Sequence, residues 1–405
     1  MSAGEIVLPE LHAVKGIRIG TASAGIKKPG RQDVVVFELA QESQVAAVFT
    51  RNAFCAAPVQ LAKKHLASGS PRWLVINTGN ANAGTGQAGL NNALKTCESL
   101  AELTQTRATS VLPFSTGVIG EPLPVEKLSA ALPAALASLQ ANAWADAASG
   151  IMTTDTRPKA ASIQLELDGQ WVTLTGITKG AGMIRPNMAT MLGFVATDAK
   201  IAQPLLQKLL KQACDQSFNR ITIDGDTSTN DACLLIATGQ SVEITEESEV
   251  SLTAFSAALL SLMQDLAQKI VRDGEGATKF VSIQIEQART EEEALEAAFT
   301  LAHSPLVKTA LYASDANWGR ILAALGRTPG LEDLDVAGVY LYLGDLLLAE
   351  QGGRAASYTE EAGTAAMQAT DLTLRLQLGR GSAQAEVWTC DFSHDYVTIN
   401  AEYRT

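Results

Sequence analysis

The spacing of apolar residues switches between that of strands and that of helices along the chain, and this pattern limits the possible folds more than any other feature. In "SIQLELDGQWVTLTGI" (162–177), apolar and polar residues alternate on both sides of Asp168-Gly169, which predicts a β-hairpin with a tight turn. The segments 204–213 and 251–274 instead space their apolar residues as amphipathic helices do. A sheet with an apolar face needs such helices to cover it.

Other segments continue the same pattern. Strands are predicted at 33–39, 45–50, 279–288 and 396–405, with a second hairpin around Gly379-Arg380-Gly381. Helices are predicted at 90–103, at 125–140, where Pro133 should bend or interrupt the helix, and at 294–303, which Thr290 and Glu293 would cap. Because no repeat or Pro/Ser-rich linker interrupts the chain, we expect one integrated α+β body. Its predicted architecture is a layered sandwich of helices and largely antiparallel or mixed sheets.

Composition narrows the class of partner. The 405 residues are 46% hydrophobic and carry a formal net charge of -12, so no basic stripe is available to displace phosphate counterions. A small-molecule partner is therefore expected, and no nucleic acid. With no visible signal segment and no apolar run of bilayer length, we expect a cytoplasmic protein with no membrane partner. The 5 cysteines and 4 histidines lack metal-ligand spacing, which predicts reduced thiols and no metal site.

Four loops combine glycine with hydroxyl, amide or charged side chains. The loop 176–182 lacks the spacing of the known nucleotide-phosphate motifs. The loop 224–231 has Thr229 where a calcium-binding loop requires glycine, which favours an ordinary turn. The loop 115–120 is either an ordinary turn or a place where backbone N–H groups bind an anion. The loop 77–84 is most simply the entry to a helix.

The segment "KGAGMIRPNMATMLGFVATDA" (179–199) joins the predicted hairpin to an apolar strand. Taken alone, Lys179 fits a solvated surface lysine and Thr190 fits the first residue of a strand. The residues by themselves therefore support a limited conclusion: this loop concentrates groups suited to catalysis.

Six segments spread along nearly the whole chain are distinctive in a further way. They are "GIMTTDTRPK", "KGAGMIRPNMATML", "RITIDGDTSTNDACLL", "VRDGEGATKF", "SDANWGRILAALGR" and "YVTINAEYRT". In this order they resemble the ornithine acetyltransferase (glutamate N-acetyltransferase) family of arginine biosynthesis, and the second segment is the most specific. The resemblance implies a self-processing enzyme like the N-terminal-nucleophile enzymes. Cleavage of the Ala189–Thr190 bond would leave an alpha chain (1–189) and a beta chain (190–405), which usually assemble into a heterotetramer.

A threonine at the start of a chain can act as both nucleophile and base. Its hydroxyl attacks, and its α-amine, with a reference pKa of about 8, accepts the proton at neutral pH. Before cleavage that amine is an amide, so the hydroxyl of Thr190 can attack only the preceding carbonyl, in an N-to-O acyl shift followed by ester hydrolysis. The small Ala189 and nearby glycines leave room for the twisted peptide that this requires.

The resemblance also implies a reaction and a site. Thr190 would take acetyl from N2-acetyl-L-ornithine, release ornithine and pass the acetyl group to L-glutamate. Thr116 and Gly117 match the oxyanion-hole pair of the family. The substrate-contacting positions that match are Thr154, Lys179, Thr190, Glu275, Asn400 and Thr405. Thr154 is favoured within "MTTDT", and Thr153 and Thr156 stay open as alternatives.

The resemblance implies no cofactor, and it leaves open whether acetyl-CoA is a second acetyl donor; we favour a bifunctional enzyme. The nearest alternative is a self-processing aminopeptidase or amidase that gives the acyl group to water. A different class, an uncleaved ligand-binding protein, would show one band on a denaturing gel where the enzyme shows two.

Overall fold

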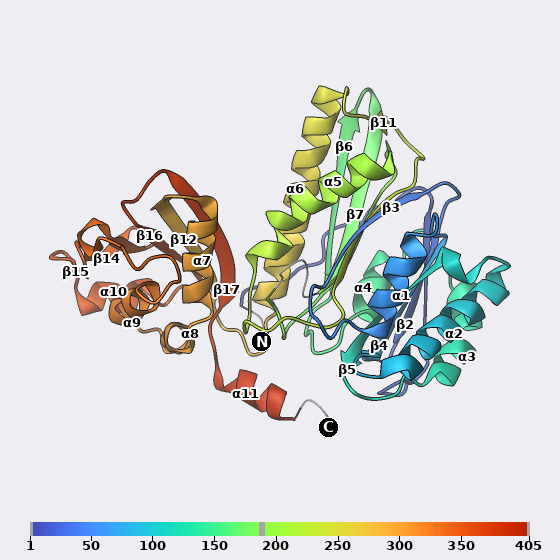
Figure 1. Ribbon diagram of the computed structural model, residues 1–405, viewed down its shortest axis with the longest axis horizontal. Coiled ribbons are helices and arrows are strands. Elements are labelled where there is room, and N and C mark those ends of the chain that lie inside the picture. Colours follow the sequence, from blue (N-terminus) through green and yellow to red (C-terminus); the bar gives the residue numbers. More distant parts are fainter. Residues whose placement is uncertain (1–2, 186–190, 403–405) are drawn as a thin grey trace.

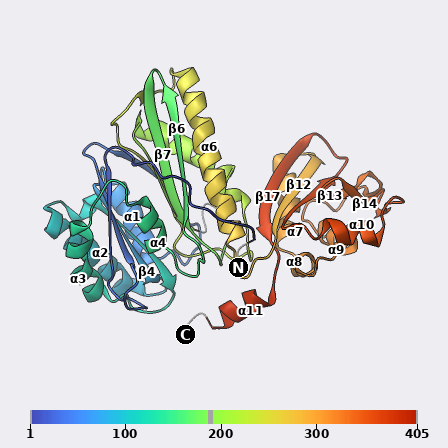
Figure 2. The ribbon, with the colours of Figure 1, turned by 180° about the vertical axis from the view of Figure 1, so that it is seen from behind.

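The computed structural model describes residues 3–185 and 191–402, and its main body is a four-layer sandwich (Figure 1). Two sheets lie face to face, and helices cover the outer face of each. A separate lobe follows in the sequence and lies beside the sandwich, as Figure 2 shows from behind. The predicted α+β layered sandwich of mixed sheets is therefore confirmed.

The first sheet has four strands in the order β1-β2-β4-β5. Their bounds are β1 Ile17–Ala22, β2 Val34–Leu39, β4 Trp73–Asn80 and β5 Val111–Val118. Helices α1 Ala57–Leu66, α2 Gly86–Thr104 and α3 Val125–Ala137 pack against this sheet, and α4 Trp144–Gly150 contacts strands of both sheets. Strands β4 and β5 are parallel, so their carboxyl ends meet at one edge of the sheet. Pro133 lies inside α3 and does not end it, because Leu128 and Leu132 anchor the helix in the core.

The second sheet has five strands in the order β3-β10-β8-β7-β6. Their bounds are β3 Gln44–Phe49, β6 Lys159–Leu167, β7 Gln170–Lys179, β8 Leu192–Thr197 and β10 Ala232–Ala237. Helices α5 Gln203–Asp215 and α6 Glu249–Arg272 cover its outer face, and β9 Lys200–Ile201 pairs with β11 Glu243–Ile244 beside it. The predicted hairpin is β6-β7, and Asp168 and Gly169 take the positive φ angles that its tight turn requires.

Aromatic side chains fill the space between the two sheets. The ring of Phe37 lies 5.7 Å from those of Trp144 and Phe194, and Phe114 lies 5.2 Å from Phe194. Helix α6 is long and apolar enough to span a membrane by length and composition alone. Its buried residues belong to the core beneath β6 and β7, which accounts for that apolarity.

The C-terminal lobe has a hydrophobic core of its own, so the chain is not the single integrated body that the sequence predicts. Its strands are β12 Phe280–Ala288, β13 Tyr340–Leu343, β14 Leu346–Glu350, β15 Gly353–Arg354, β16 Asp371–Gln377 and β17 Ala383–Cys390. Its helices are α7 Glu291–Ala302, α8 Pro305–Tyr312, α9 Trp318–Leu325 and α10 Glu360–Ala366. Thr290 caps α7 as predicted, since its side chain accepts the N–H of Glu293.

Two predictions for the tail are wrong. Strands β16 and β17 form no hairpin, because β12 lies between them, parallel to β16 and antiparallel to β17. A strand was predicted at 396–405, but residues 396–401 belong to helix α11 (His394–Ala401), and none of the described residues there pairs with a sheet edge. This helix leaves the lobe and runs back below the sandwich (Figure 1).

Candidate active site

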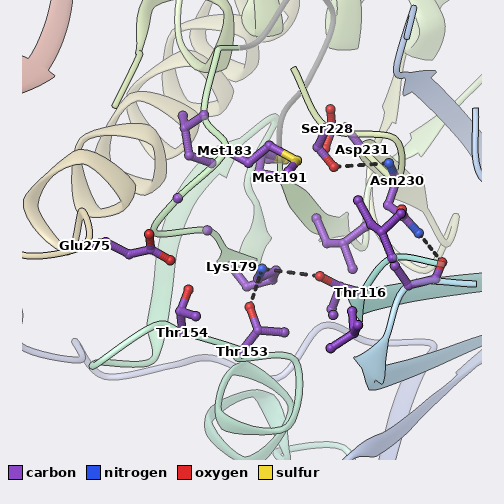
Figure 3. Close-up of a pocket in the computed structure, with 18 of the residues that line it drawn as sticks. Thr116, Thr153, Thr154, Lys179, Met183, Met191, Ser228, Asn230, Asp231 and Glu275 are labelled. Atoms are coloured by element: carbon purple, nitrogen blue, oxygen red, sulfur yellow. Dashed lines mark hydrogen bonds between the residues drawn. The ribbon is translucent and has the colours of Figure 1, made fainter. Parts of the chain in front are cut away.

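A cavity of about 240 Å³ lies where the carboxyl end of β5 meets the end of β7 and the start of β8 (Figure 3). Six residues that the sequence singled out line it: Thr116, Gly117, Thr154, Lys179, Glu275 and Asn400. Three more, Ala189, Thr190 and Thr405, lie outside the described residues. Met191, which follows Thr190 in the sequence, also lines the cavity, and the N–H of Ala232 donates to its carbonyl at 3.0 Å.

The end of β5 brings Thr116 and Gly117 to the cavity wall. The loop 115–120 is therefore the end of a buried strand and not an ordinary turn. Gly117 has φ +134°, and a Cβ there would lie 2.3 Å from the carbonyl carbon of Gly79 on β4. Only glycine allows this close approach of the two parallel strands. The backbone at Gly117 is consequently fixed against β4 at the point where it faces the cavity.

Lys179, at the end of β7, points into the cavity and is nearly buried. Its Nζ donates to Thr153 Oγ1 at 2.7 Å and to Thr116 Oγ1 at 3.3 Å. Burial lowers the pKa of Lys179, and the nearby carboxylate of Asp155, 3.9 Å away, opposes that shift. The sequence interpretation of a solvated surface lysine is therefore wrong. Its ammonium group is held beside the hydroxyl of Thr116.

A buried charge network lies behind Lys179. Asp155 Oδ1 and Asp273 Oδ2 each accept a hydrogen bond from Lys159 Nζ at 2.6 Å, and Asp155 Oδ1 also accepts the N–H of Gly180 at 2.7 Å. Burial alone would raise the pKa of Asp155, but the ammonium groups of Lys159 and Lys179 outweigh it and hold that pKa well below its usual range. This network fixes the position from which Lys179 reaches the cavity.

Glu275 enters the cavity from the opposite side, after the end of α6. Its backbone N–H donates to the carbonyl of Ala181 at 2.8 Å, and its carboxylate accepts from Asn400 Nδ2 at 2.7 Å. A Cβ on Gly182 would lie 2.4 Å from Glu275 Oε2, so the glycine-rich turn makes room for this carboxylate. The cavity thus has a cation on one side and a carboxylate on the other, which suits a zwitterionic ligand.

The sequence pattern did not predict that the segment 228–231 lines the cavity, because the loop 224–231 was interpreted as an ordinary turn. Asn230 Nδ2 donates to the carbonyls of Ala81 at 2.6 Å and Ser115 at 2.9 Å, which ties this segment to β5. Burial raises the pKa of the neighbouring Asp231, and its Oδ2 has no hydrogen-bond partner among the described residues. The run of amide and carboxylate residues directly before a buried strand was the available signal.

The three threonines of "MTTDT" have different surroundings. Thr153 and Thr154 both line the cavity, and Thr153 is the one that accepts from Lys179. The hydroxyl of Thr156 instead donates to Asp273 in the buried network. The structure therefore assigns Thr156 to the scaffold and leaves Thr153 and Thr154 at the cavity. No group of three or more potential metal-ligating residues occurs within 3–185 and 191–402.

Comparison with known proteins identifies the family. The ArgJ family model matches residues 18–405. The chain belongs to the ArgJ family. It is 58% identical to the arginine biosynthesis bifunctional protein ArgJ of Pseudomonas syringae pv. tomato and 57% identical to that of Pseudomonas fluorescens, over 407 residues and 100% of both chains in each case.

Solved ArgJ structures match parts of the chain. The arginine biosynthesis bifunctional protein argJ of Bacillus halodurans is 37% identical over 51% of this chain and 97% of its own, with a TM-score of 0.49. The ornithine acetyltransferase of Mycobacterium tuberculosis, in complex with ornithine, is 34% identical over 44% of this chain and 94% of its own, with a TM-score of 0.38. Together with the family match, the full-length relatives confirm the predicted family and an enzyme of arginine biosynthesis. They favour acetyl transfer over an aminopeptidase or amidase.

Proposed function

We propose that this chain transfers the acetyl group of N2-acetyl-L-ornithine to L-glutamate through an acetyl-enzyme on Thr190. One observation carries the proposal: the cavity gathers Thr116, Lys179 and Glu275 beside Met191, the residue that follows Thr190 in the sequence. A single cavity can serve both half-reactions, because ornithine and glutamate share an α-carboxylate and the α-nitrogen that loses or gains the acetyl group. Glutamate therefore needs no second site.

Each half-reaction exchanges one bond to the acetyl carbon. The hydroxyl oxygen of Thr190 bonds to the acetyl carbonyl carbon, the C–N bond of the donor breaks, and the hydroxyl proton passes through the α-amine of Thr190 to the departing ornithine amine. The amine of glutamate then attacks the ester carbon and releases the threonine oxygen, which takes back a proton. The products are ornithine and N-acetylglutamate.

The cavity residues divide the remaining tasks by charge and position. Thr116 and the N–H of Gly117 stabilise the oxyanion, and losing one such donor typically costs about 10²-fold in rate. The contact between Lys179 and Thr116 favours a role for the lysine at the acyl carbonyl over one at the substrate carboxylate. Glu275, held by Asn400, receives the α-ammonium group of glutamate before that group loses a proton and attacks.

Self-cleavage at Ala189–Thr190 would create the active nucleophile. The proposed products are an alpha chain (1–189) and a beta chain (190–405), assembled as a heterotetramer of two alpha and two beta chains in the cytoplasm. In this mechanism the α-amine of Thr190 supplies the base, so the reaction needs no cofactor.

The acetyl-enzyme is the decisive test. After incubation with N-acetylornithine alone, mass spectrometry should find one added acetyl group on the 190–405 chain. Double-reciprocal plots at several glutamate concentrations should be parallel, as expected for two half-reactions that share one nucleophile. Intersecting lines together with an unmodified chain would mean direct transfer between two bound substrates, and would contradict the proposed role of Thr190.

Two variants of the nucleophile separate cleavage from transfer. Thr190→Ala should remain one full-length chain without activity, whereas Thr190→Ser should still cleave because it keeps the hydroxyl and the amine. Cleavage of Thr190→Ala at the same bond would rule out self-cleavage. Faster loss of the acetyl group to water than to glutamate would instead indicate the hydrolase alternative.

A second donor follows from the same chemistry. We propose that acetyl-CoA also acetylates Thr190, with the hydroxyl oxygen displacing the thiolate, which takes up the hydroxyl proton. The full-length relatives carry the description "bifunctional", which supports a second activity in this chain. Formation of N-acetylglutamate from acetyl-CoA and glutamate, without N-acetylornithine, tests it directly.

A further inference from the structure

A second cavity of about 300 Å³ adjoins the candidate active site. Gly117, Val118, Thr153 and Thr154 line both cavities, so the two share one wall. The remaining lining of the second cavity comes from three places: the segment between β1 and β2, the end of β4, and α11 with the residue after it. None of the roles assigned so far uses the lining residues that belong to this cavity alone.

The segment 24–33, called the basic loop below, gives this cavity its charge. Lys27, Lys28 and Arg31 all line the second cavity, together with the acidic residues Asp33 and Glu402. The whole chain has 31 basic and 43 acidic residues, so three cations within five positions are unusual for it. A local positive charge beside the active site of an acidic protein attracts an anionic ligand.

The basic loop is held in place by contacts of its own. The carboxylate of Asp33, itself buried, accepts the backbone N–H groups of Ala24 at 2.6 Å and Ile26 at 2.7 Å. Lys27 packs its stem over the end of β4, where a Cβ on Gly79 would lie 3.1 Å from Lys27 Cβ. The guanidinium of Arg31 donates to the carbonyl of Met152, next to Thr153. The negative charge of Asp33 is therefore directed into the loop backbone, while Lys27 and Lys28 remain exposed.

We propose that the basic loop binds the phosphate groups of a coenzyme A thioester, whose acyl end lies in the first cavity. The two cavities are adjacent, because Gly117, Val118, Thr153 and Thr154 line both, and in this proposal one elongated molecule extends over these residues from the first cavity into the second. Lysine and arginine side chains are the usual partners of phosphate oxygens. N-acetylornithine carries no phosphate, so its binding does not require this loop. The proposal rests on the second donor proposed above.

The test compares three acetyl thioesters and one charge reversal. With glutamate as acceptor, the KM should increase from acetyl-CoA to acetyl-dephospho-CoA and again to S-acetylpantetheine, which has no phosphate. Lys28→Glu should increase the KM for acetyl-CoA by about tenfold, the effect of losing one charge-assisted hydrogen bond. It should leave the KM for S-acetylpantetheine unchanged. Lys64→Glu, also at an exposed position but on α1 and outside both cavities, is the matched control.

The reaction of N-acetylornithine with glutamate separates this proposal from the proposed function. Lys28→Glu should leave that reaction unchanged. If Lys28→Glu increases the KM for N-acetylornithine as much as the KM for acetyl-CoA, the loop binds substrate carboxylates. If the three thioesters have equal KM values in the wild type, the phosphates are not bound. Either result overturns the proposal. Inhibition of the N-acetylornithine reaction by inorganic phosphate in the wild type, but not in Lys28→Glu, would make the loop a free-phosphate site and also overturn it. If acetyl-CoA gives no turnover, the proposal fails while transfer from N-acetylornithine stands.

Discussion

Replacing Asp155 by asparagine should destabilise the sandwich strongly, although the two side chains have nearly the same volume. Asp155 Oδ1 accepts hydrogen bonds from Lys159 Nζ at 2.6 Å and the N–H of Gly180 at 2.7 Å. Its Oδ2 accepts the N–H of Thr153 at 2.9 Å and lies 3.9 Å from Lys179 Nζ. All of these partners are donors. Whichever way an asparagine amide is turned, its NH₂ group would face an N–H group and an ammonium group.

The expected loss of unfolding free energy in Asp155→Asn follows from the burial and the charge of Asp155. Asp155 and Lys159 are buried, so water cannot replace the lost carboxylate. Removing one partner of a buried ion pair typically costs about 3–5 kcal/mol, because the remaining charge is left without compensation. Asp273 still contacts Lys159 at 2.6 Å, which places the expected loss at the lower end, about 3 kcal/mol.

Urea unfolding followed by tryptophan fluorescence measures this loss. The midpoint for Asp155→Asn should decrease by at least about 0.5 M relative to the wild type. Glu166→Gln, the same carboxylate-to-amide change at an exposed position on β6, should alter stability by no more than about 0.5 kcal/mol. Equal midpoints for the two variants would refute the argument that the buried carboxylate compensates the lysines.

The pH dependence of the stability difference between wild type and Asp155→Asn provides a second test of the same argument. Because the pKa of Asp155 is depressed in the folded protein, its contribution to stability is present above the unfolded pKa of about 3.9 and is lost as the pH falls toward the folded value. The stability difference between wild type and Asp155→Asn should therefore be constant from pH 6 to pH 5. It should narrow only below about pH 4. Narrowing already at pH 5 would show that another group causes the difference.

Three further predictions concern the cavity and the tail of the chain. Gly117→Ala should decrease kcat by about 10²-fold or more, because the added Cβ would displace the backbone from Gly79. Circular dichroism should confirm that the variant folds. An unchanged kcat would show that Gly117 does not belong to the oxyanion site. Asn400→Ala should increase the KM for glutamate by about tenfold, because Glu275 loses a hydrogen bond, while cleavage of the chain proceeds. Deleting Thr405 should also decrease activity without affecting cleavage, and unchanged kinetics in both variants would show that the tail has only a structural role.

Local patterns predicted those elements whose structure is decided locally. The β6-β7 hairpin follows from alternation on both sides of Asp168-Gly169, two residues that accept the left-handed backbone of a tight turn. The cap of α7 likewise depends on residues three positions apart, Thr290 and Glu293. In both cases the partners lie within a few residues, so the sequence contains the whole argument.

The predictions for the tail were wrong because the structure there depends on residues far away in the sequence. β16 and β17 alternate as a hairpin should, but β12, almost a hundred residues earlier, occupies the place between them. Residues 396–399 favour strands by composition, yet strand propensity depends on having a sheet to join. Helix α11 instead places Tyr396 and Asn400 one turn apart, and Asn400 Nδ2 donates to both the Tyr396 carbonyl and Glu275. The contact with Glu275 thus depends on the conformation that the sequence did not indicate.

Family motifs, and not physical patterns, pointed to the six predicted residues that line the cavity, and the construction of the cavity explains why. Thr116 reaches the cavity because β4 and β5 are parallel, and Met191 because β8 and β10 are parallel. Parallel strands are joined through long crossovers, so neighbours in such a sheet are distant in the sequence. Lys179 appeared solvated for the same reason: its counter-charge, Asp155, lies on a loop before the hairpin and becomes its neighbour only when the sandwich forms. The ammonium group that faces the cavity therefore takes its position from the fold, and this position should be lost together with the packing of β6, β7 and α6.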